Sequence, residues 1–128
     1  AVEFLFPYAW SAAEIKQRLD INGLTLVLHN LPAGDWDAGE RGIACHPSRV
    51  EEFRAGVFKA IEYAKALGVS QLNCLAGKAP AGVSADELGA CLNLPSPHLA
   101  VERLFQRVLG RRVGRVIDAS NFGVLKYF

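Results

Sequence analysis

The chain has few cysteines, no methionine and no long apolar run. Its three cysteines are Cys45, Cys74 and Cys91, an odd number in which no pair has the C-x-x-C spacing. This disfavours a disulfide scaffold and a structural zinc site, and we expect free, mostly buried thiols. Cys45 and His46 are adjacent, but a zinc site would need two further ligands.

Other absences narrow the class of protein. No apolar run approaches the roughly 18–20 residues that span a bilayer, and no secretory leader is recognisable, so we expect a cytoplasmic protein without a membrane partner. Neither G-x-G-x-x-G after a strand nor G-x-x-x-x-G-K-[ST] occurs, which disfavours dinucleotide and P-loop sites. Because the chain lacks Met and opens on a strand-like run, we expect a fragment of a longer protein.

What the sequence does have is the composition of a globular α/β domain, with 128 residues, 51% of them hydrophobic and 21% charged. Residues 1–90 carry 8 basic and 11 acidic side chains, whereas residues 91–128 carry 6 basic and 2 acidic ones. The arginines of this tail are not interleaved with aromatic residues or set in a known reading motif. We therefore expect no nucleic-acid partner.

Short apolar runs at residues 2–6, 24–28 and 69–75 predict three buried strands. Helical patterns separate these runs, and such alternation is typical of parallel strands joined by helical crossovers. The order fits part of a barrel or a doubly wound sheet. A long loop at residues 29–47 follows the second strand, and loops of this length are usually functional or disordered.

The predicted helices carry start and stop signals. Ser11, Ser48 and Ser84 each precede a glutamate by three residues, the capping-box spacing, so each is expected to cap a helix. Asn-Gly at residues 22–23 ends the first helix and Leu-Gly at 67–68 ends the second.

Beyond residue 90 the pattern loosens. A helix is predicted at about residues 98–109 and a further strand at 113–117. We therefore divide the chain into a regular β-α part, residues 1–90, and an arginine-rich tail, residues 91–128.

Four long motifs carry a resemblance to a known family. They are AVEFLFPY at residues 1–8, HNLPAGDWDAGERGIAC at 29–45, EYAKALG at 62–68 and LNCLAGKAPAG at 72–82. Through them the chain resembles the hydroxypyruvate isomerase family, which includes the 2-oxotetronate isomerases. The resemblance covers residues 1 to about 90, only about a third of a barrel of about 250 residues.

The resemblance implies an α/β fold: a partial (β/α)₈ TIM barrel of the xylose-isomerase-like kind, with parallel strands two to four or two to five. It also implies an isomerase that moves a carbonyl between adjacent carbons of a small hydroxy-oxo acid through an enediolate. The family uses two glutamates on later strands, around a divalent metal ion. Those glutamates lie outside strands two to four, and no metal ligand is identified in this chain.

After residue 90 the sequence departs from the family, which would have a helix and a strand ending in Ile-Glu-Pro-Ile-Asn. The nearest likeness is VIDASN at residues 116–121. There Asp118 would replace the first catalytic glutamate, one methylene shorter, and a displacement of about 1 Å can lower a rate by about 10²-fold. The tail is either the product of a frameshift, of splicing or of a join to an unrelated sequence, or it is an authentic helix and strand that have diverged from the family.

Four residues at strand ends or on βα loops are candidates for substrate binding, since these positions face the active site of a barrel. They are Glu3, His29, Arg41 and Lys78. Glu3, expected to be buried, either faces the barrel mouth or holds a neighbouring strand or loop. His29 either hydrogen-bonds the substrate or ties down the long loop. Trp36 on that loop is either a lid or an anchor to the rim.

The two basic candidates have alternatives as well. Arg41 could clamp a substrate carboxylate with two hydrogen bonds, or form a salt bridge with Asp35, Asp37 or Glu40 on the same loop. Lys78 either contacts the substrate or is a solvated charge.

Two functions remain open from the sequence. The chain is a fragment of an isomerase, or it is a non-catalytic half-barrel or interaction module that lacks the acid/base pair. In both cases we expect the fragment alone to be inactive. An incomplete barrel exposes strand edges and apolar faces, so we also expect self-association.

Overall fold

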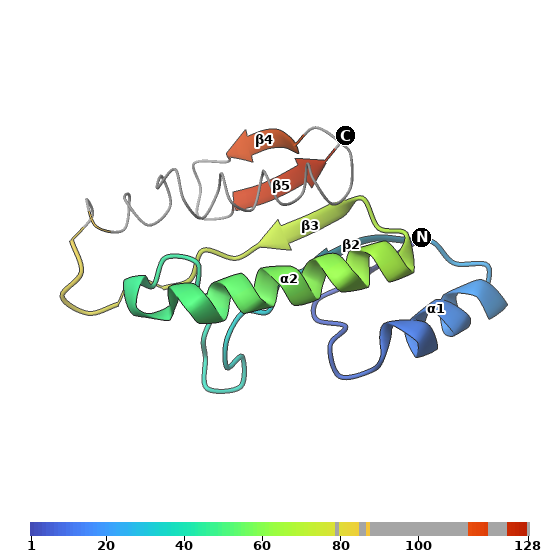
Figure 1. Cartoon of the computed structure of the whole chain (residues 1–128), viewed down its shortest axis with the longest axis horizontal. Coiled ribbons are helices and arrows are strands. Elements are labelled where there is room, and N and C mark those ends of the chain that lie inside the picture. Colours follow the sequence, from blue (N-terminus) through green and yellow to red (C-terminus); the bar gives the residue numbers. More distant parts are fainter. Residues whose placement is uncertain (79, 85–86, 88–112, 118–122, 128) are drawn as a thin grey trace.

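The computed structural model describes residues 1–78, 80–84, 87, 113–117 and 123–127 (Figure 1). Its elements are β1 (Val2–Phe4), α1 (Ala12–Ile21), β2 (Leu26–Asn30), the 3₁₀ helix η1 (Pro47–Arg49), α2 (Val50–Leu67), β3 (Gln71–Cys74), β4 (Val113–Ile117) and β5 (Gly123–Tyr127). The strands form one sheet in the order β1-β2-β3-β5-β4. No helix within the described ranges is long and apolar enough to cross a membrane.

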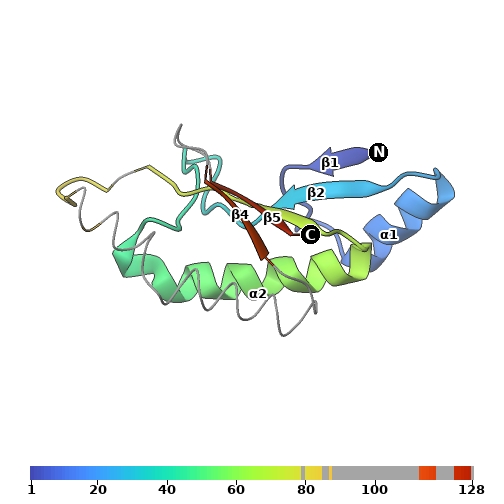
Figure 2. The same cartoon turned by 90° about the horizontal axis from the view of Figure 1, so that it is seen from above.

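The first three strands form the parallel unit that the sequence predicts. β1 pairs with β2 and β2 with β3, all parallel. The connection from β1 to β2 contains α1, and that from β2 to β3 contains η1 and α2. Figure 2 shows both helices on the same side of these strands. This is the local arrangement of a (β/α) barrel wall.

The core lies between the sheet and α2. The apolar stripe of this helix recurs at steps of three and four residues, so that one face is buried. The buried residues of α2 are Phe53, Val57, Ala60, Ile61, Ala64 and Leu67. They pack in one cluster with strand residues such as Leu26 and Leu72 and with Ile15 and Leu19 of α1.

The cap predicted for the first helix is found, and the hydrogen bonds predicted at Ser84 are formed, although the helix expected after Ser84 lies outside the described residues. The Ser11 hydroxyl accepts the Glu14 N–H at 3.2 Å, and the Glu14 carboxylate accepts the Ser11 N–H at 3.0 Å. The same pair of bonds joins Ser84 and Glu87. The cap predicted at Ser48 is wrong, because this residue lies inside η1 and α2 begins two residues later without a side-chain cap. Pro47 is the first residue of η1, so Ser48 already lies within a helical turn. A residue that caps a helix has an extended backbone instead.

Two strands of the tail complete the sheet, and the one next to β3 runs in the opposite direction. The strand predicted at residues 113–117 is confirmed as β4, and β5 was not predicted. β5 pairs antiparallel with both β3 and β4, so the tail does not continue the parallel order expected of a barrel. The connection from β4 to β5 is short, which permits antiparallel neighbours, whereas parallel neighbours need a crossover of a dozen or more residues. The helix predicted at 98–109 lies outside the described residues, and the division at residue 90 stays a prediction.

Candidate functional site

The segments that follow β1, β2 and β3 meet beyond the carboxyl ends of these strands. Phe6, after β1, packs against Trp36 of the long loop (residues 31–46), with ring centroids 5.0 Å apart. Lys78, after β3, donates from Nζ to the Gly39 carbonyl of the same loop at 3.0 Å. Active sites of α/β barrels lie at this edge, so the convergence defines the candidate site.

The long loop is folded on its own hydrogen bonds. The Glu40 carboxylate accepts the Asp35 N–H at 2.5 Å and forms an ion pair with Arg49. The Arg49 guanidinium, followed by the Asp35 N–H, lowers the pKa of Glu40 from its usual value. The Gly42 N–H donates to the Ala33 carbonyl at 3.0 Å and closes the loop. The loop therefore presents its side chains in a preset arrangement.

The two basic candidates lie on the rim of the site. Arg41 is exposed, and its guanidinium stacks 4.0 Å from the Trp36 ring and donates to the Trp36 and Glu40 carbonyls at 3.0 and 2.6 Å. The salt bridge considered for Arg41 is not formed, since the ion pairs of the described residues do not include it. Lys78 is exposed and holds the loop through Gly39. Substrate contacts by Arg41 and Lys78 stay predictions.

The Trp36 ring packs against Phe6 and against the Arg41 guanidinium, which favours its interpretation as an anchor of the loop over that as a lid. A ring that packs against both a second ring and a guanidinium is poorly suited to swing away from the rim.

His29 is fully buried on the helical side of the sheet. It lies beside Leu72 in register, and Leu72 belongs to the core that packs on α2. Its Nδ1 is 3.3 Å from the Tyr8 hydroxyl and 3.2 Å from the Asn30 carbonyl, while Nε2 has no partner among the described residues. Burial lowers the pKa of His29, so the ring is neutral near pH 7. Its predicted substrate contact stays a prediction, and the contacts seen are structural.

Glu3 is exposed, so the expectation of a buried carboxylate is wrong. Val2 and Phe4 pack against the core, and side chains alternate along a strand, so Glu3 lies on the face away from the helices. β1 is the edge strand of the sheet, which leaves this side chain accessible. This placement suits a group that faces a barrel interior, and its substrate contact stays a prediction.

Two asparagines at the site were missed from the sequence. Asn30 and Asn73 are neighbours in the register of β2 and β3, and the Asn73 Nδ2 donates to the Asn30 Oδ1 at 3.0 Å. The available signal was a polar residue near the end of each of two consecutive apolar strands. Tyr8 was also missed, and burial, with a smaller contribution from Tyr63, raises the pKa of its phenol.

The described residues do not offer a metal site. Nowhere in these ranges do three His, Cys, Asp or Glu side chains gather where they could hold a metal ion. The divalent metal ion implied by the family resemblance therefore finds no ligand set there, and we derive no step through it. Asp118, the candidate replacement for a catalytic glutamate, lies outside the described residues.

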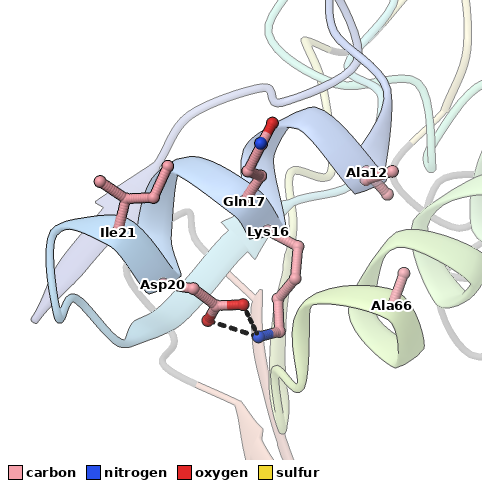
Figure 3. Close-up of a pocket in the computed structure, with 7 residues that line it drawn as sticks. Ala12, Lys16, Gln17, Asp20, Ile21 and Ala66 are labelled. Atoms are coloured by element: carbon pink, nitrogen blue, oxygen red, sulfur yellow. Dashed lines mark hydrogen bonds and ion pairs between the residues drawn. The ribbon is translucent and has the colours of Figure 1, made fainter.

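A groove on the helices lies apart from this site. It is lined by residues of α1 and by Ala66 of α2, and two of the lining residues, Lys16 and Asp20, form an ion pair at 2.5 Å (Figure 3). The lining contains none of the candidate residues, so we do not assign it to catalysis.

Parallel strands, helices on one side and loops gathered at the carboxyl edge define a segment of an α/β barrel. The chain belongs to the xylose isomerase-like TIM barrel family, which matches residues 1–110. The sequence resemblance and the α/β fold class are thereby confirmed.

Relatives of known name agree with this assignment. The chain is 59% identical to hydroxypyruvate isomerase of Escherichia coli (strain K12) over 91 residues, which are 71% of this chain and 35% of that protein. It is 52% identical to 2-oxo-tetronate isomerase of Cupriavidus necator over 81 residues, 63% of this chain and 31% of the relative. The crystal structure of AP endonuclease, family 2 from Brucella melitensis superposes with a TM-score of 0.66 at 42% identity, covering 70% of this chain and 34% of that one. The chain spans about a third of the length of these relatives.

Proposed function

We propose that this chain is part of an isomerase that interconverts small hydroxy-oxo acids. The substrate is hydroxypyruvate, with tartronate semialdehyde as product, or a 2-oxotetronate. The observation that carries the proposal is the 59% identity to a hydroxypyruvate isomerase over 91 residues. That stretch is long enough to include the loops after three strands, where barrel enzymes bind their substrates.

The proposed reaction needs no external oxidant or reductant. A carboxylate base removes a proton from the hydroxyl-bearing carbon next to the carbonyl, and the enediolate is reprotonated on the former carbonyl carbon. The hydroxyl proton passes from its oxygen to the former carbonyl oxygen. The carbonyl thereby moves by one carbon. The family resemblance assigns this proton transfer to two glutamates on later strands, with a divalent metal ion, so the described residues supply substrate binding rather than the base.

The rim of the site suits an anionic substrate. Arg41 and Lys78 are exposed cations that the long loop holds in place through backbone carbonyls. A guanidinium can bind a carboxylate through two parallel hydrogen bonds, whereas an ammonium acts as a point charge. We therefore assign the substrate carboxylate to Arg41, with Lys78 raising the local positive potential.

The direct test is to exchange the matched segment between proteins. The 91 matched residues of this chain replace their counterparts in the Escherichia coli hydroxypyruvate isomerase, and isomerisation of hydroxypyruvate and of 2-oxotetronate is measured with added Mg²⁺ or Mn²⁺. We expect the hybrid to be active and the 128-residue chain alone to be inactive. A hybrid that folds like the parent, by circular dichroism and thermal unfolding, but converts neither acid would contradict the proposal.

The alternative is a non-catalytic half-barrel that associates with itself. It is favoured by the exposed apolar side chains Leu5 and Val27, which are 65% and 37% exposed on the strands or directly after them. Such surface is usually covered by protein. An active hybrid together with a monomeric 128-residue chain would remove the support for this alternative.

A further inference from the structure

We propose that Asn30 and Asn73 form an amide pair that binds a hydroxyl group of the substrate. The inference rests on the proposed function, since it names a contact within the same site. Neither asparagine is among the site residues predicted from the sequence.

The register places both side chains on the face of the sheet opposite to the helices. His29 and Leu72, the residues just before them, are neighbours in register and lie on the α2 side. Because side chains alternate along a strand, Asn30 and Asn73 point the other way. In a barrel of this family that face is the interior, and both residues lie at the carboxyl ends of their strands, where substrates bind.

The pair leaves hydrogen-bonding groups without partners. Asn73 donates to the Asn30 Oδ1 at 3.0 Å, while the Asn73 Oδ1 is buried and has no partner among the described residues. Asn30 is 5% exposed, and its own amide still has donor hydrogens to offer. Rotating both amides by 180° exchanges the roles but again leaves one donor and one acceptor. An unpaired buried acceptor is costly, so a partner is expected.

The backbone holds the two amides in place. The Asn30 N–H donates to the Leu5 carbonyl at 3.2 Å, and the Asn30 carbonyl accepts the Tyr8 hydroxyl at 2.5 Å. The Asn73 carbonyl accepts the Leu31 N–H at 2.8 Å. The segments after β1 and β2 thus hold the pair in place before any ligand arrives, which lowers the entropy lost on binding.

The chemistry of the pair selects a hydroxyl. A hydroxyl donates one hydrogen bond and accepts others, so it satisfies the free donor and the free acceptor together. An ionised carboxylate or a ketone only accepts, and an ammonium only donates, so each leaves one amide atom unpaired. The geometry therefore points to the hydroxyl of a small hydroxy-oxo acid, while the cationic rim takes its carboxylate.

The test measures binding to the full 128-residue chain by saturation-transfer NMR, which observes the ligand and tolerates an associated protein. Hydroxypyruvate is compared with pyruvate, which lacks the hydroxyl. We expect saturable binding of hydroxypyruvate and about tenfold weaker binding of pyruvate, the value of one well-made hydrogen bond. Absence of binding, or equal affinities for the two acids, would overturn the proposal.

A variant localises the contact. Asn73→Leu removes the pair, and Gln71→Leu is the matched control, because Gln71 lies on the same strand and face two residues earlier. We expect Asn73→Leu to weaken hydroxypyruvate binding about tenfold and Gln71→Leu to leave it unchanged. If Asn73→Leu binds hydroxypyruvate as tightly as the unaltered chain does, the proposal is refuted. The comparison of the two acids on the unaltered chain needs no variant, so it still decides if Asn73→Leu fails to fold.

The two proposals can fail separately. An inactive hybrid enzyme with hydroxyl-dependent binding at Asn73 would refute the isomerase and leave the amide pair standing. An active hybrid whose chain binds pyruvate as well as hydroxypyruvate would refute the amide pair alone.

Discussion

The Tyr8 hydroxyl donates a hydrogen bond to the backbone carbonyl of Asn30 at 2.5 Å. This contact ties the segment after β1 to the end of β2, across 22 positions of sequence. The same hydroxyl lies 3.3 Å from the His29 imidazole, and the Tyr8 ring meets Tyr63 of α2 edge-on at 5.2 Å. One phenol therefore joins two strand ends to the helix that covers them.

Replacing this phenol should loosen the edge of the sheet. Tyr8→Phe leaves the Asn30 carbonyl with only the weaker His29 contact, and we expect a loss of about 1 kcal/mol in the free energy of unfolding. Tyr63→Phe is the control, because its hydroxyl bonds the Trp10 carbonyl in an exposed position. Urea unfolding at one fixed low protein concentration measures both. Equal losses in the two variants would show that Tyr8 has no special structural role.

The buried histidine should make stability depend on pH. Burial lowers the pKa of His29 below its usual 6.5, so the unfolded chain takes up this proton more readily than the folded one. Stability is therefore complete above about pH 6.5 and falls as the pH drops toward the folded pKa, by at most about 1.4 kcal/mol per pH unit.

We expect His29→Phe to flatten the unfolding profile between pH 7 and 5, and His46→Gln, the control, to keep the slope of the parent. Urea midpoints at several pH values measure this. A slope that survives in His29→Phe would assign the effect to another group.

The long loop depends on a close backbone approach at one glycine. Gly42 has φ +113°, and a Cβ there would lie 2.1 Å from the Leu75 carbonyl oxygen. Gly39 also has positive φ, at +90°, but nothing lies within 4 Å of its Cβ position. Both alanine variants carry backbone strain of about 1–3 kcal/mol, and only Gly42→Ala adds the clash.

We therefore expect Gly42→Ala to be the less stable variant and to speed proteolytic cleavage within residues 31–46. Limited proteolysis followed by mass spectrometry locates the cuts. Similar cleavage rates for Gly42→Ala and Gly39→Ala would mean that the contact with Leu75 is dispensable.

Self-association is expected of the isolated chain. Val27 is 37% exposed on β2, and exposed apolar surface favours association with other protein chains. We expect Val27→Lys to shift the sedimentation profile toward monomer, while Ala38→Lys on the exposed loop leaves it unchanged. A parent chain that sediments as a monomer and unfolds in a single two-state step would refute this expectation.

Much of the fold follows from local patterns. The apolar runs predict β1, β2 and β3, the serine-glutamate spacing predicts the start of α1, and a glycine ends α2 in the left-handed conformation at φ +72°. The cap at Ser48 fails because the preceding proline starts a 3₁₀ helix that already includes Ser48, and the serine-glutamate spacing alone does not reveal this. The convergence of the long loop with the end of β3 was also predictable, since parallel strands share their carboxyl edge.

The sequence by itself determined the β-α order, the barrel family and the charges of the rim, because these depend on residues close together in the chain. Only the tertiary structure decided that Asn30 and Asn73 touch, that His29 faces α2 and that β5 runs antiparallel to β3. The first two depend on the register between strands about 40 residues apart in the chain, and a shift of one residue turns every side chain to the other face. The direction of β5 depends on pairing between segments that lie far apart in the chain.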